Sequence, residues 1–162
     1  PRRRAPDGVR GIGRVMRLSH RVGTRASPEQ VWSVLGRPQR WPEFDVALRR
    51  VRGATGEART GQHLMAVVRG LPVAVPVDVV EALPTRRLVL RVASFPGMAH
   101  EVTTEVVPRL RGGCTLSVRV VTDGLLARPA ALPVWALSAL TTRLLASRCD
   151  RAAADQQGRL SA

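Results

Sequence analysis

The 162-residue sequence contains no lysine, no tyrosine and no asparagine, and aromatic residues make up only 3% of it. All 26 basic residues are therefore arginines, and with 12 acidic residues they give a formal net charge of +14. Such a charge is typical of proteins that bind nucleic acid or anionic lipid. However, arginine, alanine, glycine, proline and valine have GC-rich codons, and only Arg2–Arg4 form a run. Nucleic acid or an anionic membrane stays open as a partner, but the sequence does not favour either.

Cysteine is scarce, and the motifs of metal and cofactor sites are missing. The two cysteines, Cys114 and Cys149, form no C-x-x-C pair, which argues against a disulfide framework or a zinc site. The three histidines lack the spacing of metal ligands, and there is no nucleophile elbow, P-loop or G-x-G-x-x-G motif. We therefore expect two reduced thiols, no metal and no cofactor.

Long hydrophobic runs are also lacking. No uninterrupted apolar run approaches the ~18 residues of a membrane span, and residues 1–14 lack the apolar centre of a signal peptide. We expect a cytoplasmic protein, monomeric or homodimeric. Residues 1–14 are predicted to be a flexible basic leader, residues 15–155 a single domain of ordinary size, and residues 156–162 a frayed tail.

Most of the few aromatic residues lie in one stretch, Ala26–Phe44, which reads ASPEQVWSVLGRPQRWPEF. Ser27 and Gln30 have the spacing of a capping box, which predicts a helix that Gly36 ends. Residues 40–44 predict a second short helical turn. The two short helices would carry three aromatic side chains, which either pack as core or stack on a flat ligand: Trp32, Trp41 and Phe44.

Elsewhere the apolar residues alternate with polar ones, as in half-buried strands. Turn signals separate these runs, and short turns favour antiparallel pairing. Pro76 lies inside one run, where a proline requires a bulge or an edge position. The predicted strands, seven in all, cover residues 16–24, 46–52, 62–69, 73–83, 87–95, 99–107 and 114–122.

A single long helix of about 20 residues is predicted within residues 130–154. Its apolar stripe must be buried, and one face of the sheet is the only large apolar surface that the sequence offers. We therefore predict an α+β fold in which a curved seven-stranded antiparallel sheet wraps around this helix and leaves a hydrophobic cavity. The stripe consists of Val134, Leu137, Leu140, Thr141, Leu144 and Leu145.

Five pieces of the chain, ASPEQVWSVL, RWPEF, VVEALPTRRLVLRV, GGCTLSVRV and the terminal helix, resemble the START-like (SRPBCC) superfamily. The similarity is to its polyketide cyclase/dehydrase-like and lipid-transport-type members and covers roughly residues 16–150. It implies a helix-grip fold with an internal hydrophobic cavity. Members of this superfamily bind lipids, sterols, polyketides or quinones, and only some of them are enzymes.

Alternation along the strands predicts which side chains line the cavity, because alternate residues share one face. Two of them, His100 and Thr104, are polar groups on an apolar face, so they either orient the polar end of a ligand or are satisfied within the core. The predicted ligand-binding residues are Trp32, Phe44, Leu90, Val92, His100, Val102, Thr104, Leu116, Val118, Leu137, Thr141 and Leu144.

The candidate catalytic residues are His100, Thr104 and Asp78. Asp78 would face outward in a regular strand but inward if Pro76 forms a bulge, where it could act with His100 as an acid/base pair. His20 and His63 are expected on the surface. The predicted function is binding or transport of a hydrophobic small molecule. The alternatives are a polyketide aromatase/cyclase and a protein that binds RNA or anionic membrane through its arginines.

Overall fold

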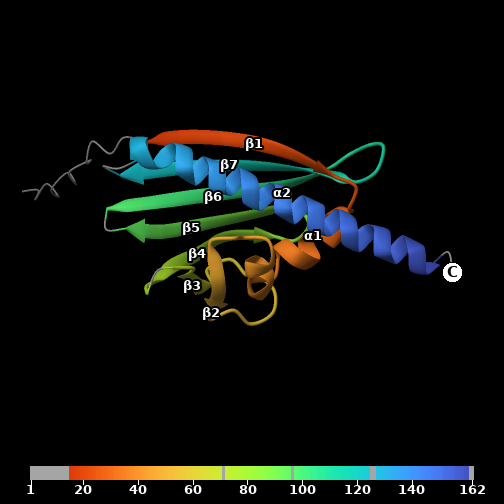
Figure 1. Ribbon diagram of the computed structural model, residues 1–162, viewed down its shortest axis with the longest axis horizontal. Helices are drawn as coiled ribbons and strands as arrows, with labels where there is room; N and C mark the ends of the chain where they lie inside the picture. The colour runs from red at the N-terminus through yellow and green to blue at the C-terminus, as the bar shows by residue number, and fades with distance from the viewer. Residues whose placement is uncertain (1–14, 71, 96, 125–126, 161–162) are drawn as a thin grey trace, which may run out of the picture.

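The computed structural model describes residues 15–160 except 71, 96 and 125–126, so the predicted leader lies outside the described residues. One 3-10 helix, two α-helices and seven strands follow one another in the predicted order (Figure 1). The elements are β1 (Met16–Thr24), α1 (Pro28–Leu35), the 3-10 helix η1 (Pro38–Glu43), β2 (Leu48–Arg52), β3 (His63–Val68), β4 (Ala74–Leu83), β5 (Arg87–Phe95), β6 (Met98–Pro108), β7 (Cys114–Gly124) and α2 (Ala127–Leu160).

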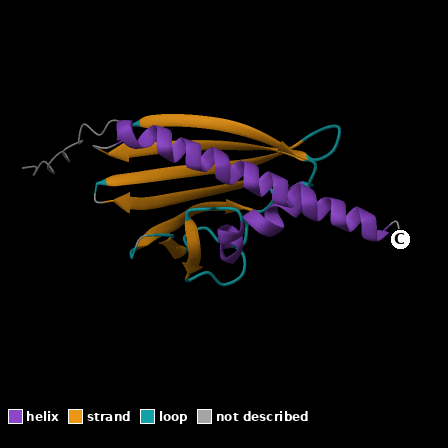
Figure 2. Ribbon diagram, viewed as in Figure 1, coloured by secondary structure: helices purple, strands orange, loops and turns teal. Residues whose placement is uncertain are grey.

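The seven strands form one antiparallel sheet in the order β1-β7-β6-β5-β4-β3-β2. The strands from β2 to β7 each pair with the next strand in the chain, as in a meander. β1 pairs with β7 along its whole length and forms the other edge of the sheet. α2 crosses one face of this sheet obliquely, and α1 and η1 lie beside the second half of α2 (Figure 2). The predicted α+β helix-grip architecture is confirmed.

The start and end of α1 follow from three residues. Ser27 Oγ accepts a hydrogen bond from the Gln30 amide (3.3 Å), and Gln30 Oε1 accepts one from the Ser27 amide (2.8 Å), which completes the predicted capping box. Gly36 caps the other end. A Cβ atom there would lie 2.6 Å from two atoms of the Trp32 ring, so the indole can fold over this position only because it is glycine.

The three aromatic side chains of this stretch belong to the hydrophobic core. Trp32, Trp41 and Phe44 are only 4%, 5% and 6% exposed, and the Trp41 indole N–H donates to the Leu35 carbonyl (2.8 Å). Because α1 and η1 carry them against one end of the sheet, they close that end by packing. This explains why the few aromatic residues of the chain gather there.

α2 is longer than the sequence predicts and is rotated about its axis. It has 34 residues, or about 51 Å at the usual rise, and its last turns extend past the sheet (Figure 1). It packs against β1, β7 and α1. The predicted stripe is wrong in part, since Leu137 and Leu140 are 38% and 44% exposed. The buried face beyond the first turns instead includes Ala139, Thr142, Leu145, Ala146 and Cys149.

The register of β4 decides the position of Asp78. Pro76 lies opposite Met65 in a regular pairing with β3, and pairing with β5 begins only at Val77, so the proline has an edge position without a bulge. The irregularity of β4 lies later, between Val79 and Glu81. Asp78 therefore faces outward.

There Asp78 Oδ1 lies 2.6 Å from His63 Nδ1, and the His63 side chain is 85% exposed. The predicted surface position of His63 is confirmed. The alternative in which Asp78 turns inward to pair with His100 is wrong, because the two side chains lie on opposite faces of the sheet.

Candidate functional site

The inner face of the sheet, which α2 crosses, carries rows of side chains over β1, β7, β6 and β5, and three neighbouring rows matter for the site. Neighbouring strands place residues of equal parity beside one another, so each row holds one residue from each strand. An apolar row separates two rows that each contain a histidine. The three rows are His20–Val118–Thr104–Leu88, Leu18–Val120–Val102–Leu90 and Met16–Thr122–His100–Val92.

Part of this inner face is fully covered. Leu116 and Val118 are 0% and 2% exposed, and Thr104 is also buried. β7 lies directly beneath α2, which accounts for the burial of its side chains. Together with Trp32 and Phe44, these predicted ligand-binding residues are in contact with other protein atoms over nearly their whole surface.

Another part of the inner face, on β5 and β6, is not fully covered by other protein atoms. Leu90, Val92 and Val102, from β5 and β6, are only half-buried, although they have the same parity as their buried neighbours. The reason is the position of α2, which packs on β1 and β7. We call these three residues the uncovered strip. Apolar side chains that keep accessible surface on an inner face leave room for an apolar guest.

One face of α2 turns toward this side of the sheet. Leu137, Thr141, Leu144 and Arg148 follow one another at spacings of three or four residues, so they share a helix face. Arg148 on that face reaches Glu43 of η1, which orients the face toward the short helices and away from the edge strand β1. Thr141 and Leu144 are half-buried there, and the Thr141 hydroxyl is buried without a hydrogen-bond partner.

His100 is held by two hydroxyl groups. Its Nε2 lies 2.7 Å from Ser94 Oγ of β5, and its Nδ1 lies 3.0 Å from Thr122 Oγ1 of β7. Burial lowers the pKa of His100 below its ordinary value of 6.5, so the ring is neutral near pH 7. One ring nitrogen then donates to one hydroxyl, and the other accepts from the second. Thr104 and Asp78, the other catalytic candidates, are not hydrogen-bonded to this ring in the described part of the chain.

Ser94 and Thr122 are functional candidates that the sequence-based selection missed. Both have the inward parity of their strands, and that signal could have identified them. They turn a lone buried histidine into a cluster of three polar side chains at the edge of the uncovered strip, because Val92 lies directly opposite His100. We call Ser94, His100 and Thr122 the polar cluster.

The predicted surface position of His20 is wrong. His20 lies on the inner face of the sheet, where it contacts α2. Its Nε2 lies 3.0 Å from Thr142 Oγ1 of α2, and its ring meets the Trp135 ring edge-on with centroids 6.3 Å apart. Burial, and then the Arg143 guanidinium, lower the pKa of His20. The alternation of Arg17 and Arg21 with inward residues could have revealed its orientation.

The two inward histidines do not form one site. They lie two strands and four residues apart in the register, which corresponds to about 16 Å. His20 fastens α2 to β1, whereas His100 lies where no helix contact involves its ring nitrogens. Of the two, His100 is the one that adjoins the uncovered strip.

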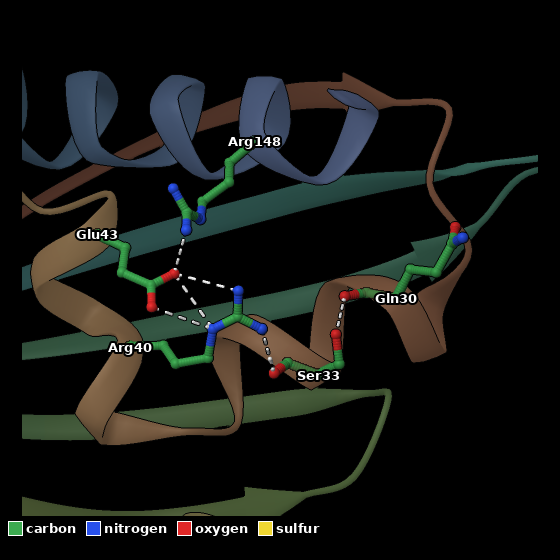
Figure 3. A network of polar contacts seen from close by, with 5 residues as sticks. All are labelled: Gln30, Ser33, Arg40, Glu43 and Arg148. Carbon is green, nitrogen blue, oxygen red and sulfur yellow. Dashed lines mark hydrogen bonds and ion pairs between the residues drawn. The ribbon is translucent and has the colours of Figure 1, made fainter. Parts of the chain in front are cut away.

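A polar network joins the helices at the end of the sheet that α1 and η1 cover, which we call the closed end (Figure 3). Glu43 Oε2 accepts from Arg148 Nη2 of α2 (2.6 Å) and Arg40 Nη2 (3.1 Å), and Arg40 also donates to the Ser33 carbonyl of α1 (3.3 Å). Because these side chains are roughly a third exposed, each ion pair contributes little alone. Their geometry nevertheless joins α1, η1 and α2.

Asp150 provides a second link between α2 and β1. Its Oδ1 accepts from Thr24 Oγ1 (2.5 Å) and from the Arg25 amide (2.7 Å). Cys149 beside it is buried, and burial raises the pKa of this thiol to about 11. Among the residues that the structure describes, no three histidine, cysteine, aspartate or glutamate side chains lie close enough together to hold a metal ion.

The arrangement is suited to holding an apolar molecule with one polar group. The uncovered strip offers apolar surface, and the polar cluster offers hydroxyl and imidazole groups at its edge. For acid/base chemistry the same cluster offers one neutral imidazole and no carboxylate partner among its hydrogen bonds in the described residues.

Comparison with known proteins agrees with this geometry. The family described as polyketide cyclase/dehydrase and lipid transport matches residues 16–156. No curated protein sequence is detectably similar to the chain.

Solved structures share its fold at low sequence identity. A protein from Thermobifida fusca, solved by solution NMR, is 22% identical with a TM-score of 0.67, over 83% of this chain and 93% of that one. The di-domain ARO/CYC StfQ of the steffimycin biosynthetic pathway is 18% identical with a TM-score of 0.69, over 86% and 52%. Norcoclaurine synthase from Thalictrum flavum is 14% identical with a TM-score of 0.60, over 82% and 94%.

Proposed function

This chain belongs to the polyketide cyclase/dehydrase and lipid transport family of the START-like superfamily, and from that premise we propose that it binds and carries a hydrophobic small molecule between its sheet and α2. The family description covers both carriers and enzymes. The choice between them has to come from the inner face of this chain. We favour the carrier for the reasons that follow.

The observation that supports the proposal most is the incomplete burial of Leu90, Val92 and Val102. Native cores are close-packed, and leaving apolar side chains accessible forgoes stabilisation of roughly 25 cal/mol per Å². An apolar guest that covers the uncovered strip would recover this stabilisation. The ligand class follows from the same surface, namely a molecule that is mostly hydrocarbon or aromatic.

The polar cluster would orient that ligand. A hydroxyl or carbonyl group at one end of the molecule could replace or join the hydrogen bonds that Ser94 and Thr122 now make with His100 (2.7 and 3.0 Å). A neutral imidazole and two hydroxyls bind neutral oxygen groups without the cost of burying a charge. The ligand therefore carries at most one or two oxygen-containing groups at this end.

The second candidate is a polyketide aromatase/cyclase, in which His100 would move a proton from the folded chain of a poly-ketone. Its position beside the uncovered strip favours this role. Against it, both ring nitrogens already have hydroxyl partners, and Asp78 is on the other face. A folded poly-ketone needs several converging polar groups for enolisation and dehydration, whereas beside the uncovered strip the described residues provide the polar cluster alone.

Native mass spectrometry of the protein purified from its own host tests the carrier proposal. We expect an additional mass of a few hundred daltons that disappears on denaturation and extracts into organic solvent. A protein that is empty in repeated preparations, and that takes up no lipid or polyketide when these are added, contradicts the proposal.

The variant His100→Ala separates the two candidates. A carrier would keep its ligand with altered affinity, because His100 supplies only a polar contact. An aromatase/cyclase supplied with its poly-ketone would lose turnover, whereas His63→Ala, on the exposed outer face, would keep it.

A further inference from the structure

The outward face of the first half of α2 is apolar and exposed. Leu132 is 72% exposed and Leu140 is 44% exposed, and Ala136 and Pro133 between them are exposed as well. Positions 132, 136 and 140 recur every four residues, so they form one continuous stripe. Leu137, 38% exposed, borders it. We call Leu132, Pro133, Ala136, Leu137 and Leu140 the leucine face.

Core packing does not account for the leucine face. α2 already buries Ala139, Thr142, Leu145 and Ala146, on its opposite side, against the rest of the protein. By length and composition, Ala127–Asp155 is long and apolar enough to cross a membrane. The packing against β1, β7 and α1 instead leaves only its outward face available, which suits contact along a surface.

The charged side chains of α2 itself are of one sign as far as Cys149. Residues 127–149 contain three arginines and no acidic residue, and the nearest acidic residues along the chain are Asp123, before the helix, and Asp150. Two of these arginines, Arg128 and Arg143, are exposed near the two ends of the leucine face. A positive rim around exposed leucines repels a second copy of the same surface, but it attracts the negative surface of an anionic bilayer.

The sequence before β1 carries more positive charge. β1 and α2 begin at one end of the sheet (Figure 1), and Val15, just before β1, is 44% exposed. The preceding residues 1–14 contain five arginines and one aspartate. Each arginine that comes close to an anionic lipid surface strengthens binding by about 1 kcal/mol.

We propose that the leucine face docks on the surface of an anionic lipid bilayer, with Leu132 and Leu140 inserted among the lipid chains and Arg128 and Arg143 at the headgroups. Nucleic acid would use the arginines but would leave the leucines exposed to water, so the lipid surface accounts for more of the observations. The docking is independent of whether the inner face holds a ligand. If it does, Leu137 borders both surfaces, and the bilayer is where the ligand is exchanged.

Sedimentation of the full chain with vesicles tests this proposal. We expect the protein to bind vesicles of phosphatidylcholine with phosphatidylglycerol and to bind phosphatidylcholine alone much less. Leu132→Ser with Leu140→Ser should weaken binding at least about tenfold, because each leucine loses its transfer into the apolar layer. The matched control is Leu110→Ser in the β6–β7 turn, where the leucine is fully exposed, which should bind as the parent does.

Charge variants complete the test. Arg143→Gln should weaken binding to the anionic vesicles by about fivefold. Circular dichroism confirms that each variant is folded. The proposal is overturned if the leucine variant binds as well as the parent, or if deletion of residues 1–14 alone accounts for all binding. It is equally overturned if the leucine variants abolish a dimer seen by light scattering while no vesicle binding is detected.

Discussion

The two ends of this molecule differ in how completely their apolar side chains are buried. The closed end is the one where α1 and η1 lie, and we call the end where α2 begins the open end. At the end where α1 and η1 lie, Trp32, Trp41 and Phe44 are at most 6% exposed, and ion pairs of Glu43 join the surrounding helices. At the end where α2 begins, inner residues such as Val92 keep accessible surface, and Leu132 lies on the outside at 72% exposure. The same sheet and the same helix contribute to both ends.

This difference in burial assigns stability mainly to the closed end and ligand or surface binding to the open end. Close packing at the first end provides the cooperative core, and it uses three of the five aromatic residues of an aromatic-poor chain. Incomplete packing at the second end lowers stability and leaves apolar surface for other molecules. Changes at the closed end should therefore affect folding, whereas changes at the open end should affect binding.

The largest expected effect comes from Trp41→Ala. Removing a buried indole together with its hydrogen bond to Leu35 should lower the free energy of unfolding by about 3–5 kcal/mol. Leu90→Ala, in the uncovered strip, should cost only about 1–2 kcal/mol, because its side chain is half-buried. Urea denaturation measures both variants, and equal losses would remove the contrast between the two ends.

Gly36→Ala should have the next largest effect. The new methyl group would lie 2.6 Å from the Trp32 ring, and overpacking of this kind costs about 1–3 kcal/mol. Gly23→Ala on the exposed side of β1 is the control, since its methyl group would meet only the flexible end of Arg109. If the two variants have the same midpoint of thermal unfolding, Trp32 is not packed over Gly36 as described.

A pH dependence should distinguish the open end. The pKa of His100 is lowered by burial, so the unfolded chain binds a proton more readily than the folded one. Stability should therefore be complete above pH 6.5 and decrease as the pH falls below this value toward the lowered pKa of the folded state. His20 contributes in the same direction.

The control for this pH dependence is His100→Asn, in which the decrease between pH 7 and pH 5 should be smaller than in the parent. Urea midpoints at several pH values would measure it. An unchanged slope in the variant would mean that His100 does not titrate in this way.

The smallest effect is expected for Glu43→Gln. It removes the ion pairs with Arg40 and Arg148, whose side chains are partly exposed, so the loss should be about 0.5–1 kcal/mol and should shrink at high salt. Glu101→Gln, on the exposed outer face of β6, is the control. A loss of several kcal/mol would show that the network does more than orient three helices.

Local signals in the sequence predicted most of the fold. The capping box of Ser27 and Gln30 located α1, and the alternation of residues in β5, β6 and β7 gave their inner faces correctly. These features depend on neighbours within a few residues, which is why one sequence is enough to read them. The resemblance to the START-like superfamily supplied the arrangement of the elements, and the matching family confirms it.

What the sequence could not give depends on contacts between distant segments. Leucines occur on every side of α2, so hydrophobicity alone did not show that the small side chains of Ala139 and Ala146 would face the rest of the protein. Similarly, His100 was recognised as an inward polar residue, but its partners Ser94 and Thr122 come from two other strands. The position of Asp78 required the register around Pro76.

Titration with a neutral apolar dye such as Nile red tests the central claim most directly, because an uncharged probe is insensitive to the net charge of +14. We predict saturable binding at one site, weakened about tenfold by Leu90→Gln or Val102→Gln. Val80→Gln, at a 46% exposed position on the outer face of β4, should leave it unchanged. Absence of saturable binding, or equal weakening by all three variants, would contradict a ligand site on the inner face.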